Sequence, residues 1–189
     1  MNSHQSSQTL IAWGVLADAR LAIGLLEGCE YQDRYWRVYW TAAISLIRLI
    51  GDVLHKVDAK KSDTHKMAIG NHWATITARK PEPSIFWEFI KRERDLTLHE
   101  YQFSFGWNMD LIGIVNNGVV YFEDDGTPFL IDFLRYPLAA NDKHPFAGQD
   151  VRDILNEAIL WWENELAGIE MKIAPAKCPC PKPSPDTHR

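Results

Sequence analysis

The amino-acid sequence predicts a mainly α-helical protein: an up-and-down bundle of four long helices with a three-stranded antiparallel β-meander inserted before the last helix. Two observations lead to this prediction. Apolar residues recur at steps of three or four through four stretches of the chain, which is the spacing of a buried helix face. Between the third and fourth stretches, short runs rich in Val, Ile, Phe and Tyr are separated by turns that contain Asn, Asp and Gly, which is typical of β-hairpins.

Length and charge limit the size of the domain and the kind of partner. The chain has 189 residues, enough for one domain with a sizeable core. We expect this domain to span residues 1–173, with the β insertion at about 108–134 and a disordered Pro-rich tail at 174–189. The formal net charge of −5 provides no global basic field, so any contact with RNA needs a local basic patch.

Cysteine usage and the N-terminal residues predict a cytoplasmic protein. Residues 1–8 contain no basic region followed by an apolar run, so we expect no signal peptide. No uninterrupted apolar stretch reaches ~18 residues, so we expect no membrane span. The three Cys lack the spacing of a disulfide framework, and Cys178 and Cys180 lack a second Cys or His pair at zinc-finger spacing. We therefore expect a reducing compartment, no metal and no cofactor.

The first two predicted helices are Thr9 to about Glu27, ending near Gly28, and Gln32 to about Val57. The second is apolar over most of its circumference, which predicts burial by several neighbours or by a partner chain. Its polar residues form one narrow stripe because they are three or four apart: Arg34, Arg37, Thr41, Ser45, Arg48, Asp52 and His55. This stripe is either a solvated outer face or the lining of a cleft that binds an anion.

The next predicted segment is a polar connector at residues 58–66. It is followed by an ambiguous stretch at 67–80, which is compatible with a short helix, and by the sequence Lys80-Pro-Glu-Pro83. The two prolines disfavour helix before them, and Ser84 is the predicted cap of the third long helix. The predicted strands are Met109–Val115, Val119–Glu123 and Phe129–Leu134. Asp150 is the predicted cap of the last helix, whose apolar face is Val151, Ile154, Leu155, Ala158, Trp162, Leu166 and Ile169.

The end of the third helix combines four reactive side chains within eight residues: Arg94, Asp95, His99 and Tyr101. On a regular helix, Arg94 and His99 point in directions that differ by ~140°. The two side chains therefore converge only if the helix ends or distorts near Thr97, or if a second chain contributes one of them. No P-loop, dinucleotide fingerprint, nucleophile elbow or zinc-protease motif occurs in the sequence.

The segment Arg94-Asp-Leu-Thr-Leu-His99 resembles the R-x4–6-H motif of HEPN domains, the "higher eukaryotes and prokaryotes nucleotide-binding" helical bundles. His99-Glu-Tyr101 is further similar to the R-x4-H-x-Y form in the toxin half of HEPN–nucleotidyltransferase pairs. The position near the end of the third long helix is similar too, whereas the β insertion departs from the minimal bundle. The resemblance implies a metal-independent endoribonuclease of toxin or defence type, acting as a homodimer, with RNA as substrate and an antitoxin or other protein as partner.

The resemblance also implies a role for each residue. His99 transfers protons during attack of a ribose 2′-OH on the adjacent phosphorus, because an imidazole suits proton transfer near neutral pH. Arg94 stabilises the charge on the phosphoryl oxygens, and Asp95 orients His99. Tyr101 is a supporting donor or the acceptor of a regulatory modification. The candidate residues for holding the RNA backbone are Arg34, Arg37 and Arg48.

The same residues also fit a non-catalytic helical bundle that binds a protein partner or a nucleotide. In that interpretation Arg94 and Asp95 pair with neighbours, and His99 is a residue at a helix end, where the helix dipole favours a cation. Tyr101 is then part of the core. The two interpretations differ in one observable: whether Arg94 and His99 meet in a solvent-accessible place.

Overall fold

The computed structural model describes residues 10–29, 34–105 and 144–174, together with Leu138 and three short strands. The side chain of Arg34 and those of the strands lie outside the described part. The elements are α1 (Ala12–Glu27), α2 (Arg34–Lys56), η1 (Asp58–Lys60), α3 (Asp63–Ala78), η2 (Ile85–Lys91), α4 (Arg92–Asp95), η3 (Leu96–Glu100), β1 (Ile114–Asn116), β2 (Val119–Tyr121), β3 (Pro128–Leu130) and α5 (Val151–Ile173).

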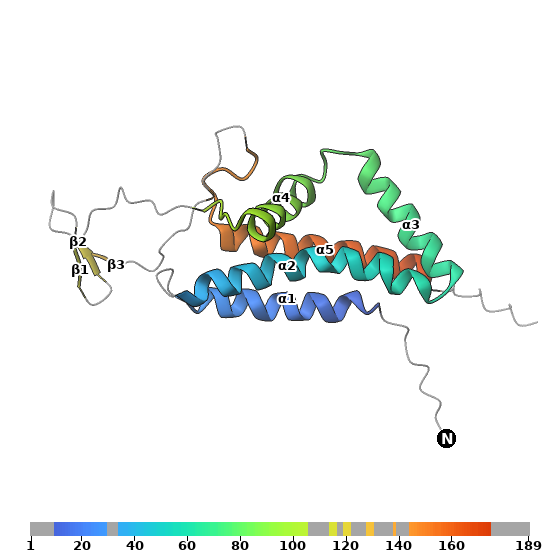
Figure 1. The fold of residues 1–189 in the computed structure, drawn as a ribbon, viewed down its shortest axis with the longest axis horizontal. Coiled ribbons are helices and arrows are strands. Elements are labelled where there is room, and N and C mark those ends of the chain that lie inside the picture. Colours follow the sequence, from blue (N-terminus) through green and yellow to red (C-terminus); the bar gives the residue numbers. More distant parts are fainter. Residues whose placement is uncertain are drawn as a thin grey trace, which may run out of the picture.

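α2 is the central helix of the fold. Figure 1 shows α1, α2 and α5 side by side, with α4 on the side of α2 and α5 away from α1, and α3 leading away from the far end of α2. α2 contacts α1, η1, α3, η2, α4 and α5. The core is rich in aromatic residues because large rings fill the space between these helices. Its largest fully buried side chains include Trp36, Trp40, Phe86, Phe89 and Trp162.

By length and composition, α2 also resembles a membrane span, contrary to the expectation that no such stretch exists. The segment Tyr35–Lys60 contains a window of 18 residues with mean hydropathy 1.2, and it is the one such segment in the described part of the chain. The central helix of a bundle passes the same test, because helices that pack on several neighbours are apolar on several faces. α2 contacts six other elements, and 39% of the apolar window is buried by them.

The predicted fold class is wrong in the number of helices. The described residues contain an additional helix, α3, where the sequence indicated only a connector and an ambiguous stretch. The side chain of Ser62 caps α3 by accepting a hydrogen bond from the backbone N–H of His65 at 3.3 Å, and the Ser62 hydroxyl lies 2.8 Å from Nδ1 of His65. The first turn of α3 is polar, and its apolar face has only three residues, Ala68, Ile69 and Ile76. The helix is therefore difficult to recognise in the sequence.

The predicted β-meander is also wrong as a component of the fold. No strand lies within residues 10–29, 34–105 or 144–174, where the helices pack on one another. The chain forms three strands of three residues each, which pair with one another in the order β1-β2-β3, and Figure 1 shows them apart from the helices. So short a ribbon cannot supply a face of the core, which is built from the helices and from Leu10, Phe105, Leu138 and Phe146 beside them.

The residues at the two ends of the segment that includes these strands, Phe105 and Leu138, are neighbours in space. Phe105 and Leu138 form an isolated antiparallel bridge. The backbone of Leu138 is in turn hydrogen-bonded to Gly148 and Gln149, which lead into α5. Phe105 itself packs edge-on against Trp36 and Trp40, with ring centroids 4.5 and 4.8 Å apart. The two ends of the segment are therefore fixed to each other and to α2.

The last helix agrees with its prediction. Asp150 caps α5 by accepting a hydrogen bond from the backbone N–H of Arg152 at 2.9 Å. All seven predicted core positions of this helix are buried: Val151, Ile154, Leu155, Ala158, Trp162, Leu166 and Ile169. The predicted polar N-terminus and the predicted disordered tail, including Cys178 and Cys180, lie outside the described residues.

α1 is anchored by a residue that the sequence did not single out. The two carboxylate oxygens of Asp58, in η1, accept hydrogen bonds from the backbone N–H groups of Ile11 and Ala12 at 2.9 and 3.0 Å. Asp58 is fully buried and also pairs with Lys61 at 2.8 Å. The first turn of a helix exposes N–H groups without helical partners, and a carboxylate there satisfies them and interacts favourably with the helix dipole.

Candidate site at the end of the third helix

The helix that carries the motif is not a regular α-helix. η2 and η3 are both π-helical, and only the four residues of α4 between them have α-helical hydrogen bonding. In η3 the carbonyl of Leu96 accepts the backbone N–H of Tyr101, five residues later, and that of Gln102 at 3.2 Å. Tyr101 then adopts a left-handed conformation with φ of 51°, which ends the helix.

The π-turn brings Arg94 and His99 together. A π-helix links residue i to residue i+5, so each residue turns by less than the 100° of an α-helix and side chains five apart approach each other. Nη1 of Arg94 lies 3.1 Å from Nε2 of His99. The distortion near Thr97, which the sequence analysis required for convergence within one chain, is present. The two side chains meet without a second chain.

The contact between the two side chains defines the state of the imidazole. A guanidinium group has only donors, so Nε2 of His99 accepts from Arg94, and in the neutral ring the proton lies on Nδ1. His99 is exposed and the Arg94 side chain is 34% exposed, so both are accessible from solvent. A cation and an imidazole lone pair are thus adjacent at the surface.

Asp95 does not occupy the predicted position. One of its oxygens accepts a hydrogen bond from Nη1 of Arg94 at 2.9 Å, and the other pairs with Nζ of Lys91 at 3.3 Å. Burial acts to raise the pKa of Asp95, but the hydrogen bonds and charges of Arg94 and Lys91 outweigh it and hold the pKa below its ordinary value. No hydrogen bond joins Asp95 to His99 among the described residues, so Asp95 orients the arginine rather than the histidine.

Tyr101 lies at the surface beside the pair. Its side chain is 66% exposed, which excludes the core position that the non-catalytic interpretation assigned to it. Its ring packs edge-on against Phe103, with centroids 5.3 Å apart. The phenol is accessible from solvent and lies two residues after His99.

Of the three arginines of the α2 stripe, the structure describes the side chains of Arg37 and Arg48. Arg48 pairs with Asp52 at 3.3 Å, and its guanidinium group lies 5.7 Å from the ring centroid of Phe86, roughly two helical turns before Arg94. Arg37 is exposed, and its carbonyl accepts a hydrogen bond from the Thr41 hydroxyl at 2.7 Å. Arg34 begins α2, and its side chain lies outside the described part. Within the described part of the stripe, Arg37 and His55 are exposed, whereas Thr41, Ser45, Arg48 and Asp52 are half-buried, and Arg48 is paired with Asp52.

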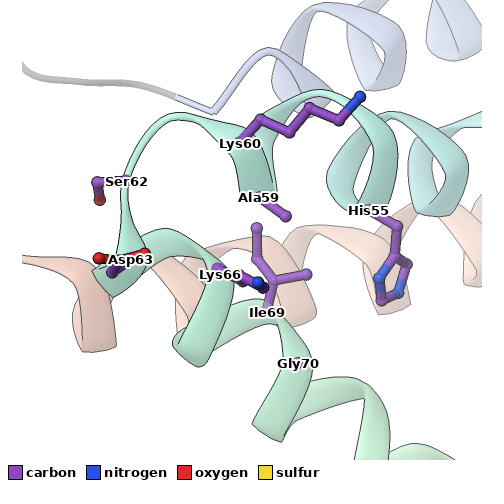
Figure 2. Close-up of a pocket in the computed structure, with 8 residues that line it drawn as sticks. All are labelled: His55, Ala59, Lys60, Ser62, Asp63, Lys66, Ile69 and Gly70. Atoms are coloured by element: carbon purple, nitrogen blue, oxygen red, sulfur yellow. The ribbon is translucent and has the colours of Figure 1, made fainter.

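A hollow in the described surface lies elsewhere, where α2, η1 and α3 meet. Figure 2 shows the eight residues that line it: His55, Ala59, Lys60, Ser62, Asp63, Lys66, Ile69 and Gly70. Burial lowers the pKa of His55, and the charges of Arg48 and His72 lower it further, against the opposing effect of Asp52. None of the predicted site residues lines this hollow. The described residues also contain no group of three or more metal-ligating side chains.

The sequence did not indicate the structural roles of Thr97 and Glu93, which lie in the same helix as Arg94 and His99. Trp40 donates its indole N–H to the hydroxyl of Thr97 at 3.2 Å, which fixes the middle of the π-turn to α2. Glu93, next to Arg94, is buried with 1% exposure. The signal was available, because Glu93 and Thr97 continue the apolar face of Phe86, Phe89 and Ile90 at helical spacing. A carboxyl group on such a face is unusual and indicates a special role.

Comparison of the chain with known protein families, with curated proteins and with solved structures gave no match.

Proposed function

We propose that the protein is a HEPN-like, metal-independent endoribonuclease whose active centre contains Arg94 and His99. The observation that supports this proposal is the 3.1 Å contact between Nη1 of Arg94 and Nε2 of His99 at an exposed helix end. A cleavage site of this kind needs a base for the ribose 2′-OH and a cation for the phosphoryl oxygens. A phosphate that binds Arg94 replaces the bond to His99 and frees Nε2 to take the proton. We further propose that the protein is cytoplasmic.

In this proposal the other residues assist. Asp95 holds Arg94 in place through a 2.9 Å hydrogen bond. Tyr101 supplies an exposed phenol for contact with RNA or for regulatory modification by an antitoxin. Of the α2 arginines, Arg37 is the candidate for a contact with the RNA backbone, because it is exposed and Arg48 is paired with Asp52.

The test is incubation with structured and unstructured RNA in the presence of a chelator. We expect cleavage by the wild type and a loss of at least about a hundredfold in His99→Ala and in Arg94→Ala, because general base catalysis contributes roughly 10²–10⁴-fold. The matched controls are Arg79→Ala, after the end of α3, and His55→Ala, on α2, which change an exposed arginine and an exposed histidine outside the motif helix. Cleavage that survives both Arg94→Ala and His99→Ala eliminates this assignment. Heterodimers that mix the two inactive variants then test whether two chains share one site.

A second candidate function is an interaction module without catalysis. It is favoured by an apolar surface opposite the core on α1, where Leu21 and Leu25 are 65% and 45% exposed, and by the 60% exposure of Val38 on α2. Exposed apolar patches of this kind occur at protein–protein interfaces. In this case Leu21→Asp abolishes binding of the partner protein or self-association, whereas His99→Ala leaves binding unchanged.

A further inference from the structure

Tyr101 is a large aromatic residue in a backbone conformation that favours glycine. Its φ of 51° is the one positive value outside glycine among the described residues. Helices that end in a left-handed residue usually have glycine or asparagine there, because a Cβ atom makes this conformation unfavourable. Ending the helix therefore does not explain why this position is a tyrosine. An outlier of this kind indicates that the side chain itself has a role.

A row of aromatic rings leads from the core to Tyr101. Phe105 packs edge-on against the buried rings of Trp36 and Trp40, with centroids 4.5 and 4.8 Å away. Between ring centroids, Phe103 lies 5.5 Å from Phe105, and Tyr101 lies 5.3 Å from Phe103. Phe105 is 6% exposed and Phe103 is half-buried, whereas Tyr101 is 66% exposed. The core thus supports a ring that is presented at the surface.

The contact with Phe103 leaves a face of the Tyr101 ring free. The two ring planes are 73° apart, which is an edge-to-face contact. Such a contact covers at most one face of either ring. Within the described part of the chain, Tyr101 has no second aromatic neighbour. Its ring therefore offers a flat, accessible surface of the kind on which nucleobases stack.

The Arg94–His99 pair lies beside this ring in the chain. His99 is two residues before Tyr101, so their Cα atoms are at most about 7 Å apart. Nη1 of Arg94 in turn lies 3.1 Å from Nε2 of His99, and a guanidinium group binds phosphate well. A phosphate and a flat base are the two parts of every nucleotide. The structure offers a partner for each of them at one helix end.

We propose that the ring of Tyr101 is a stacking platform for one nucleobase of the RNA strand whose phosphate binds to Arg94. The identity of the ligand, RNA, rests on the proposed function, and the platform adds which part of the RNA is recognised. A base inside a duplex is stacked on its neighbours, so the platform accepts a base that is unpaired and unstacked. Because every base has an aromatic face, we expect little dependence on the identity of the base.

Binding of an RNA strand that cannot be cleaved tests the platform. The probe is a short strand with 2′-O-methyl groups, which block the attacking hydroxyl, and its only base is a fluorescent purine analogue. We expect the wild type to quench the fluorescence of this base. Tyr101→Ala should bind the strand about 5- to 150-fold more weakly and with little quenching, which is the range that stacking on an aromatic side chain contributes.

Two variants control for the hydroxyl and for the loss of any exposed tyrosine. Tyr101→Phe keeps the ring and removes the hydroxyl, so it should bind and quench like the wild type. Tyr35→Ala removes an exposed tyrosine that packs on Tyr39 in α2, outside the motif helix, and should leave binding unchanged. A Tyr101→Phe variant that binds as weakly as Tyr101→Ala assigns the contact to the hydroxyl and overturns the platform.

The same strand without its base separates stacking from general damage to the turn. If Tyr101 acts through the base, Tyr101→Ala weakens binding of the complete strand and leaves binding of the baseless strand unchanged. Three results overturn the platform: an equal loss with both strands, wild-type affinity in Tyr101→Ala, or no quenching by the wild type.

Cleavage assays then distinguish failure of this proposal from failure of the proposed function. Quenching that depends on Tyr101, in a protein that cleaves no RNA, supports the platform and refutes the ribonuclease. Cleavage that is lost in His99→Ala but keeps the wild-type KM in Tyr101→Ala supports the ribonuclease and overturns the platform.

Discussion

Asp58→Ala removes the anchor of α1, and the structure allows the loss of stability to be worked out. The carboxylate of Asp58 accepts two backbone N–H groups, at 2.9 and 3.0 Å, from a site with no solvent exposure. A hydrogen bond to a charged group contributes about 1.5–3 kcal/mol, and the freed N–H of buried Ala12 has no water to replace it. The two bonds together therefore contribute about 3–6 kcal/mol. The ion pair with Lys61, whose side chain is 27% exposed, adds little.

Urea denaturation followed by tryptophan fluorescence measures this loss. We expect Asp58→Ala to lower the free energy of unfolding by about 4 kcal/mol, which corresponds to a decrease in Tm of roughly 10 °C for a chain of this length. Asp58→Asn retains one acceptor and should lose at least half as much. The control is Asp63→Ala, an exposed acidic residue in the first turn of α3, with an expected effect of less than about 1 kcal/mol. A loss in Asp58→Ala no larger than in Asp63→Ala refutes the reasoning.

Three further predictions concern packing, a buried hydrogen bond and pH. A Cβ atom at Gly51 would lie 3.2 Å from Cη2 of Trp162, so Gly51→Ala should lower the free energy of unfolding by about 1–3 kcal/mol, as measured by thermal unfolding. The control is Gly70→Ala, which has open space around it and should be neutral or stabilising by up to ~1 kcal/mol. Thr97→Val leaves a buried indole N–H without its acceptor and should cost about 1–3 kcal/mol, with a shifted indole proton resonance as the direct sign. The folded-state pKa of Glu93 is raised, so the stability that its protonated form provides is complete below the ordinary carboxyl pKa and is lost as pH rises to the raised pKa. Between these two pKa values, the free energy of unfolding of the wild type should fall relative to that of Glu93→Gln by about 1.4 kcal/mol per pH unit. Parallel stability–pH curves for the two proteins contradict this prediction.

The predictions from sequence succeeded where a local pattern determines the structure. The face of α5 from Val151 to Ile169 follows the 3.6-residue period, and Asp150 caps it through a bond two residues away. α3 was predicted only as an ambiguous stretch at 67–80, compatible with a short helix, because its polar first turn and weak apolar face give little periodic signal. The meander was overestimated because hairpin turns and β-branched runs specify local strand pairing, not a face of the core.

The candidate site was predictable only in part. The sequence identified Arg94 and His99 and required a distortion near Thr97, but a π-turn leaves no signature in a pattern read at 100° per residue. Asp95 was predicted to orient His99, but its two oxygens bind Lys91 and Arg94, which are both cations. The anchor of α1 by Asp58 joins residues 46 and 47 positions apart, and a contact of that kind follows from tertiary packing alone.

The bridge between Phe105 and Leu138 has a consequence for how this chain can change in evolution. Because the two residues are paired with each other and Phe105 is packed on Trp36 and Trp40, the distance between the end of the motif helix and the start of α5 is set by the bridge. It does not depend on how many residues join the two bridged positions. We expect insertions or deletions between them to leave the helix contacts and the Arg94–His99 pair unchanged. The length of this part of the chain can therefore vary while the helical scaffold stays the same.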